Sequence, residues 1–141
     1  DFGMYSWDPS CHATLAIGLS VQDKGGRTIR THDPVRAERI IAEDLLQRFP
    51  FGSTRISARG IWKDKTGAAV REPSVVIQLT SLVCVGFAAE IQTLARVLAR
   101  KLEQRSVLVK LTGPTGRTCT AFVMRTGGHT VSPRCQALVA A

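Results

Sequence analysis

Apolar residues alternate with polar or small residues in five stretches of the chain, which is typical of strands with one face against a core. These stretches are residues 12–21, 53–63, 69–80, 106–112 and 118–125. In the first, Ala13, Leu15, Ile17 and Leu19 fall on one face and the intervening residues on the other. We therefore expect five β-strands.

Two other stretches follow the helical period. Asp33 and Pro34 resemble an N-cap followed by proline at the first helical position, and residues 50–52 (Pro-Phe-Gly) would end that helix. In residues 88–103 the apolar side chains share one helical face and the basic ones lie outside it. The apolar set is Ile91, Leu94, Ala95, Leu98 and Leu102. The sequence predicts one helix in each stretch.

Glycine and proline mark the connections. Residues 22–31 are expected to be a loop, residues 64–67 a turn with Gly67 at positive φ, and residues 113–116 a second turn. Pro73 lies inside the third predicted strand, and proline cannot donate a hydrogen bond to a β-ladder. We therefore expect a bulge or bend at Arg71-Glu72-Pro73.

The resulting order is β-α-β-β-α-β with one extra C-terminal strand. This is an α+β fold of the ferredoxin-like split βαβ type, with two helices on one face of an antiparallel sheet. We expect an N-terminal tail (residues 1–11), a single domain (residues 12–125) and an irregular C-terminal tail (residues 126–141). The sheet face opposite the helices would be open to a ligand, to the tails or to a second subunit.

Composition adds little about function. The 141 residues fit one domain, and no apolar run is long enough for a membrane span. The net charge of +8 favours anionic partners, but the basic residues are scattered along the chain. Binding of nucleic acid or another polyanion through this basic surface is therefore only a second alternative.

The four cysteines, Cys11, Cys84, Cys119 and Cys135, are widely spaced. An even number suits two disulfides in an oxidising compartment, with three possible pairings, whereas four buried thiols would suit a reducing one. No close pair such as C-x-x-C is present, so we expect no metal site, and no motif points to a cofactor.

The ends of the chain suggest export and assembly. The first residue is Asp1, so we expect a product whose signal segment has been removed and an extracytoplasmic location. The aromatic residues Phe2, Tyr5 and Trp7 need cover from the domain or from a neighbouring subunit. We therefore expect a homo-oligomer formed through the sheet face or the tails.

The candidate ligand site is the bend in the third strand. Arg71, Glu72 and Ser74 could there share a pocket with Arg59 or Trp62, and an arginine–carboxylate pair can bind a small anion or transfer a proton. A structural ion pair that fixes the bulge is the competing interpretation. No catalytic constellation is predicted: His12, His32 and His129 are far apart in sequence, and no nucleophile motif is present.

The central part of the chain resembles a small bacterial family known only as a domain of unknown function, often made as exported proteins. The matching residues are Arg48-Phe49-Pro50, Gly52, Thr54, Gly60, Trp62, Arg71-Glu72-Pro73-Ser74, Gln104 and Ser106-Val107-Leu108. The resemblance implies a Cys11–Cys119 disulfide, which leaves Cys84 with Cys135. Leu98 and Leu102 stand where that family would have aromatic residues.

These observations favour a non-catalytic, exported, ferredoxin-like domain that self-associates. The first alternative is a small-ligand-binding protein or an enzyme with its site at the Arg71-Glu72 bend. Whether the chain is an enzyme is left open by the sequence, which favours a non-enzyme.

Overall fold

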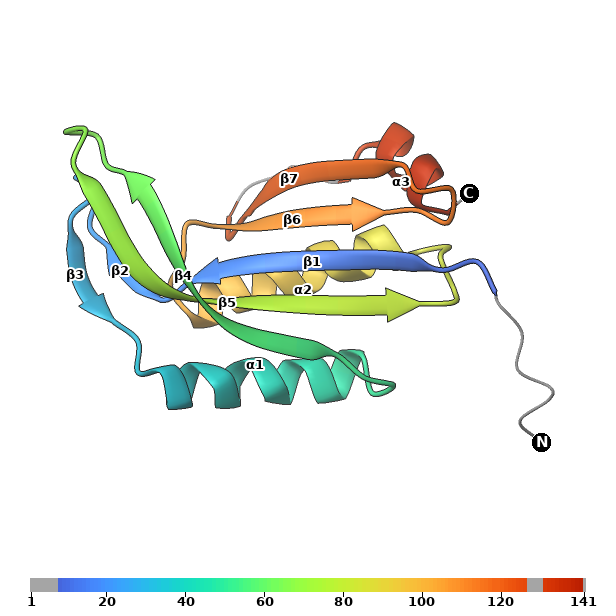
Figure 1. Ribbon diagram of the computed structural model, residues 1–141, viewed down its shortest axis with the longest axis horizontal. Helices are drawn as coiled ribbons and strands as arrows, with labels where there is room; N and C mark the ends of the chain where they lie inside the picture. Colours follow the sequence, from blue (N-terminus) through green and yellow to red (C-terminus); the bar gives the residue numbers. More distant parts are fainter. Residues whose placement is uncertain (1–7, 127–130, 141) are drawn as a thin grey trace.

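A computed structural model describes residues 8–126 and 131–140 of the chain. Its main element is a five-stranded antiparallel sheet in the order β4-β5-β1-β6-β7 (Figure 1). The strands are β1 (Cys11–Gly18), β4 (Thr54–Lys63), β5 (Ala69–Ser81), β6 (Ser106–Thr112) and β7 (Thr118–Met124). The first strand of the chain thus lies at the centre of the sheet.

The helices are α1 (Pro34–Arg48), α2 (Phe87–Lys101) and α3 (Pro133–Ala140). The buried side chains of α1 and α2 join a single core with those of β1, β5 and β6. The order β1-α1-β4-β5-α2-β6, followed by β7, confirms the predicted ferredoxin-like α+β fold with an additional strand.

The core consists of the apolar positions that the patterns predict. Leu15 and Ile17 of β1 are completely buried, and Ala13 is 2% exposed. The predicted stripe of the second helix is buried along its whole length: Ile91, Leu94, Ala95, Leu98 and Leu102. This stripe is one part of a core to which α1, β1, β5 and β6 also contribute, and burial of such apolar surface is the main favourable term in folding.

The structure also confirms the predicted helix cap and the predicted turns. Asp33 caps α1 by accepting a hydrogen bond from the Arg36 backbone N–H at 3.1 Å, and Pro34 is the first helical residue. Gly67 and Gly116 have φ values of 85° and 84° in the two predicted turns. Residues with a side chain rarely adopt this conformation.

The prediction of one strand over residues 12–21 and a loop over residues 22–31 was wrong. β1 stops at Gly18, and a second hairpin follows, formed by β2 (Ser20–Gln22) and β3 (Thr28–Thr31). The chain leaves the sheet at Leu19, whose N–H donates to the Pro73 carbonyl at 2.9 Å. All four residues of β3 are exposed, so β3 has no alternation that the sequence could reveal.

Of the predicted bulge or bend at Pro73, the bulge is absent, since the β4–β5 register runs without a shift from Thr54 to Lys63, while β5 as a whole is curved (Figure 1). The Pro73 carbonyl points toward Leu19, and in a strand the backbone nitrogen of a residue points the same way as its carbonyl. That side of β5 loses its partner where β1 ends, at the Gly18–Ser74 pair. Proline at this position therefore removes no hydrogen bond from the β4–β5 ladder.

The C-terminal segment is not irregular over residues 133–140, where α3 forms and packs on α2 and β7. Cys135 of α3 is bonded to Cys119 of β7, whereas Cys11 and Cys84 are free thiols. The implied Cys11–Cys119 and Cys84–Cys135 pairings are thus both wrong. β7 places Cys119 opposite Leu111, on the helix-covered face where α3 lies.

No helix within the described residues is both long and apolar enough to cross a bilayer. The aromatic residues Phe2, Tyr5 and Trp7 and the third histidine, His129, lie outside the described residues.

Candidate functional site

The carboxylate of Glu72 lies over the sheet face that the helices leave open. Glu72 is paired with Gly60 across β4–β5, and the neighbouring Ser74 is paired with Gly18 of β1. A Cβ atom added to Gly18 would lie 2.3 Å from Glu72 Oε1. The missing side chain of Gly18 therefore creates the space in which this carboxylate lies.

One oxygen of this carboxylate is fixed. Glu72 Oε2 accepts a hydrogen bond from the Ser20 backbone N–H at 3.0 Å, and the Ser20 carbonyl accepts one from Gln104 Nε2, also at 3.0 Å. Gln104 is 9% exposed and its bond to Ser20 is buried, whereas the bond between Ser20 and Glu72 is only partly buried. Glu72 Oε1 has no hydrogen-bond or ion-pair partner in residues 8–126 and 131–140.

A cleft of about 720 Å³ opens above Glu72. Ala16 and Gly18 form part of its lining together with two aromatic residues, Trp62 and Phe122. Five basic residues also line it: Lys24, Lys63, Lys65, Arg105 and Arg125. The volume is in the range of small-molecule sites, and the lining combines aromatic surface with a few fixed polar groups.

A second acceptor in this cleft lacks a partner. Gln22 lines the cleft and donates through Nε2 to Thr28 Oγ1 at 2.9 Å. Its Oε1 is buried and has no hydrogen-bond partner among the described residues. Buried acceptors are nearly always satisfied in native proteins, so this oxygen indicates a buried water beside the cleft.

The structure brings together only some of the predicted site residues. Trp62 and Glu72 line the same cleft, and Ser74 Oγ lies on the same sheet face, 3.8 Å from a Cβ built on Gly60. Arg59 and Arg71 lie at the alternate positions of β4 and β5 and so point to the other face. The predicted Arg71–Glu72 pair at one pocket is therefore wrong, because consecutive strand residues face opposite sides.

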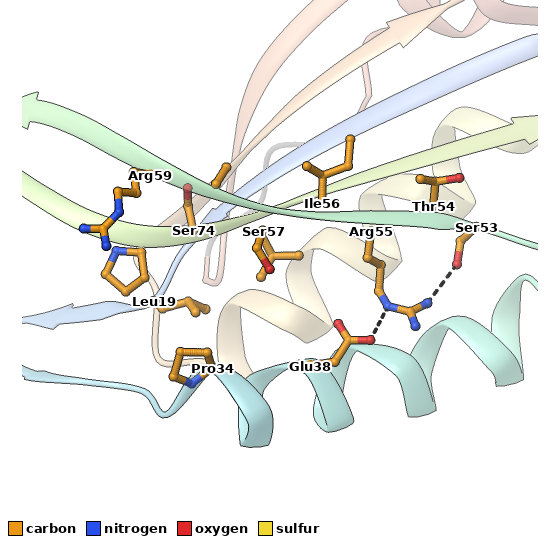
Figure 2. A pocket seen from close by; sticks show the side chains of 13 residues that line it. Leu19, Pro34, Glu38, Ser53, Thr54, Arg55, Ile56, Ser57, Arg59 and Ser74 are labelled. Carbon is orange, nitrogen blue, oxygen red and sulfur yellow. Dashed lines mark hydrogen bonds and ion pairs between the residues drawn. The ribbon is translucent and has the colours of Figure 1, made fainter.

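A larger groove, of about 920 Å³, runs between α1 and β4 on the helix side (Figure 2). Figure 2 shows Arg55 reaching down to Glu38 of α1, with an Nε–Oε1 distance of 2.6 Å, while Ser74 points away from the helix. Glu38 is the one carboxylate among the residues that line the groove, and Arg55 neutralises it. The groove also holds Arg59, but the carboxylate of the groove is already paired, whereas Glu72 offers a carboxylate oxygen to the cleft on the other face.

Sequence reasoning missed Ser20, Gln22 and Phe122 as parts of the site. Gln104 stood out in the resemblance, but its function as the anchor of Ser20 did not follow from it. The described histidines contribute nothing here: His12 bonds Ser10 and Thr80, and His32 bonds the Leu102 carbonyl at 2.7 Å. No cluster of three His, Cys, Asp or Glu side chains suited to a metal occurs among the described residues.

Two solved structures share this fold. A phage SAM lyase in complex with S-methyl-5'-thioadenosine superimposes with a TM-score of 0.63 at 20% identity, over 86% of this chain and 95% of that one. The apo state of a phage SAM lyase gives a TM-score of 0.63 at 23% identity, over 89% of this chain and 98% of that one. No curated protein matches the chain in sequence.

The comparison corrects the expectation of a non-catalytic domain, because the fold is one in which an enzyme is built. A profile described as a protein of unknown function (DUF3574) matches residues 12–119. The resemblance to a family of unknown function is thereby confirmed, and the chain belongs to the DUF3574 family.

Proposed function

We propose that the chain is an enzyme that binds a sulfonium nucleoside of the S-adenosylmethionine class in the Glu72 cleft. The observation that carries the proposal is the Glu72 carboxylate, which is fixed through Oε2 to Ser20 and whose Oε1 has no partner within residues 8–126 and 131–140. A fixed carboxylate stabilises a positive charge without the cost of reorganising itself. The enzyme activity of the two structures with the same fold supports this choice of ligand.

The cleft offers a complementary contact for each part of such a ligand. Aromatic side chains such as Trp62 and Phe122 stack on purine rings, and base–aromatic stacking is typically worth about 1–3 kcal/mol. The basic residues of the lining suit a carboxylate. Glu72 suits the sulfonium or ammonium charge.

The reaction that we propose for this ligand is loss of a neutral thioether from the sulfonium, in which Glu72 acts as a base rather than through its attraction for the positive charge. When a carbon–sulfur bond of S-adenosylmethionine breaks toward sulfur, the sulfur keeps the electron pair and loses its positive charge. Loss of the amino-acid arm in this way leaves S-methyl-5'-thioadenosine. Glu72 would hold the sulfonium in place, and its Oε1 would accept a proton from the carbon next to the breaking C–S bond. The electron pair of that C–H bond forms a C=C bond as the C–S bond breaks, so the arm leaves as an unsaturated amino acid.

The test is to titrate the protein with S-adenosylmethionine and with S-methyl-5'-thioadenosine by calorimetry, in the wild type and in Glu72→Gln. Glutamine keeps the shape and the acceptor for Ser20 but removes the charge. We expect the variant to bind the sulfonium about 10–100-fold more weakly, the loss of one charged contact. Affinity for the uncharged thioether should change less than about threefold.

Arg71→Gln is the matched control, because Arg71 is the next residue of β5 and faces the other side of the sheet. It should leave both affinities unchanged.

Activity is measured by following formation of the thioether by chromatography. Buffer alone and Glu72→Gln are the two controls, since S-adenosylmethionine also decomposes on its own. Failure of the folded wild type to bind either nucleoside would contradict the proposal, as would equal weakening of both by Glu72→Gln.

Self-association through the open sheet face or the tails stays a prediction from the sequence. Ile56 and Phe122, 45% and 68% exposed, support it, because they add apolar surface to that face. Light scattering over a wide concentration range tests it, and a monomer throughout would contradict it. The extracytoplasmic location and the binding of polyanions likewise stay predictions.

A further inference from the structure

The two free thiols lie together at the opposite end of β1 from Glu72. Cys11 is the first residue of β1 and is completely buried, while Cys84 lies in the connection between β5 and α2 and packs against the core. Cys11 Sγ is 3.4 Å from the Ser81 carbonyl oxygen, and Cys84 Sγ is 3.9 Å from the same oxygen. Two residues distant in sequence thus place their sulfur atoms against one carbonyl group.

The backbone around these thiols is fixed before any bond forms. Cys11 and Ser81 are register partners across β1 and β5. Ser81 Oγ donates to the Val83 carbonyl at 2.8 Å and accepts from the Val83 N–H at 3.1 Å. This local turn folds the chain back, so that Cys84 is held beside the end of β1.

The two thiols differ in reactivity. Burial, and after it the neighbouring Cys84 thiol, raises the pKa of Cys11 to about 12. The thiolate is the nucleophile in disulfide exchange, so Cys11 is almost unreactive toward external reagents near neutral pH. Cys84 is only partly buried and is therefore the thiol that meets an oxidant first.

We propose that Cys11 and Cys84 form a second disulfide when a small disulfide such as oxidised glutathione is present. The Cys84 thiolate attacks one sulfur of the oxidant, forms a mixed disulfide and releases one glutathione thiolate. Cys11 then gives up its proton and attacks the Cys84 sulfur, which releases the second glutathione. Two protein thiols are oxidised and one glutathione disulfide is reduced to two thiols.

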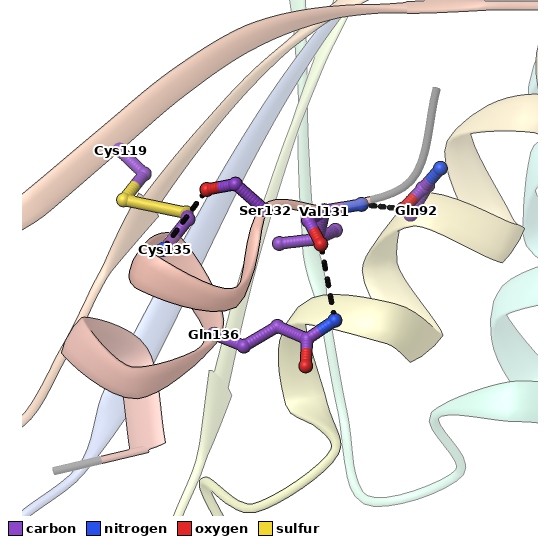
Figure 3. Close-up of a disulfide and its surroundings, with 6 residues drawn as sticks. All are labelled: Gln92, Cys119, Val131, Ser132, Cys135 and Gln136. Carbon is purple, nitrogen blue, oxygen red and sulfur yellow. Dashed lines mark hydrogen bonds between the residues drawn. A yellow bond between two sulfur atoms is a disulfide. The ribbon is translucent and has the colours of Figure 1, made fainter. Parts of the chain in front are cut away.

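The bond would tie the start of the central strand to the connection that precedes α2. The Cys119–Cys135 disulfide ties α3 to β7 in a comparable way, beside Ser132 and Val131 (Figure 3). Each disulfide then joins a strand to a segment on the helix-covered side of the sheet. The new bond closes much the longer loop, so it constrains the unfolded chain more strongly.

Peptide mapping tests the pairing. The whole protein is equilibrated in glutathione buffers of rising oxidised fraction, quenched with acid, alkylated in denaturant and digested with trypsin without reduction. Lysine and arginine residues separate all four cysteines, so each lies on its own tryptic peptide. We expect the Cys11 and Cys84 peptides to become linked, together with a rise in Tm of several degrees.

Two variants make the result specific. Cys84→Ser should abolish the new linked peptide and its rise in Tm, while the Cys119–Cys135 pair persists. Cys119→Ser should leave the Cys11–Cys84 link intact. The proposal is overturned if Cys11 and Cys84 are both fully alkylated after the most oxidising buffer, or if Cys11 is found linked to Cys119 or Cys135.

Discussion

The two faces of the central strand β1 differ in how they are filled. On one face Ala13, Leu15 and Ile17 are closed off under the helices, at 2%, 0% and 0% exposure. On the other face the last two positions are Ala16 and Gly18, and they line the cleft. One face fills its space with side chains, and the other leaves space beside a charged group.

The two faces of β1 thus separate residues that stabilise the fold from residues that leave space for a ligand. The filled face gains free energy from apolar burial, and any loss of volume there is costly. The open face keeps a carboxylate over a glycine, an arrangement that contributes little to packing but leaves room for a ligand. Variants on adjacent residues of one strand can therefore test the two functions separately.

The largest expected effect is on the filled face. Leu15→Ala should lower the free energy of unfolding by about 2–5 kcal/mol, since it removes a completely buried side chain and leaves a cavity. Its neighbour on the open face, Thr14→Ala, should cost less than about 1 kcal/mol. Urea denaturation of both variants under one redox condition measures the two values.

An equal loss for both variants would break the comparison. It would mean that the open face at Thr14 is covered in solution, and a second copy of the chain would be the first candidate. The unfolding midpoint would then also depend on protein concentration.

A smaller effect on the free energy of unfolding is expected from the titration of Cys11, which lies at the edge of the filled face. Burial raises its pKa from 9.0 to about 12, so the folded state holds the proton more tightly than the unfolded state does. The stabilisation is complete below the unfolded pKa and is lost progressively as the pH rises from about 9 to about 12. It amounts to at most about 4 kcal/mol.

The measurement is urea denaturation of the reduced protein at about pH 8 and about pH 10.5, beside Cys11→Ala. Lysine and tyrosine titrate in both proteins, so the difference between them isolates the thiol. The wild type should lose more stability than the variant over this interval. Once the wild type carries a Cys11–Cys84 disulfide, it should lose no more stability than Cys11→Ala over this pH interval, because the thiol no longer titrates. Identical losses in the reduced proteins would contradict the assignment of the raised pKa.

The filled face could be predicted because each of its elements repeats a pattern over many residues. The alternation in β1 and the stripe on α2 each have one solution in which the apolar side meets a core. The hairpin of β2 and β3 has no such repeating pattern, since all residues of β3 are exposed. α3 has only eight residues and, among those described, a single completely buried one, Val139, so its period was too short to recognise.

The open face could be predicted only in part. Glu72 and Trp62 were identified as candidates, and both line the cleft. Arg71 was placed beside Glu72 although strand alternation sends consecutive residues to opposite faces, and this rule was available from the sequence. The anchors Ser20 and Gln104 could not be found in this way, because they reach Glu72 only through the turn at Leu19 and the end of α2.

Gly18→Ala, beneath the carboxylate, should change stability much less than Leu15→Ala. Gly18→Ala would place a Cβ 2.3 Å from Glu72 Oε1, so the flexible carboxylate must move and its bond to Ser20 is lost, at about 1 kcal/mol. Gly60→Ala is the control, because its Cβ would lie 3.7 Å from Glu72 Cγ, an ordinary contact. Calorimetry should show sulfonium affinity reduced about tenfold or more by the first variant alone. Equal affinities in the two variants would mean that the carboxylate position over Gly18 does not matter for binding.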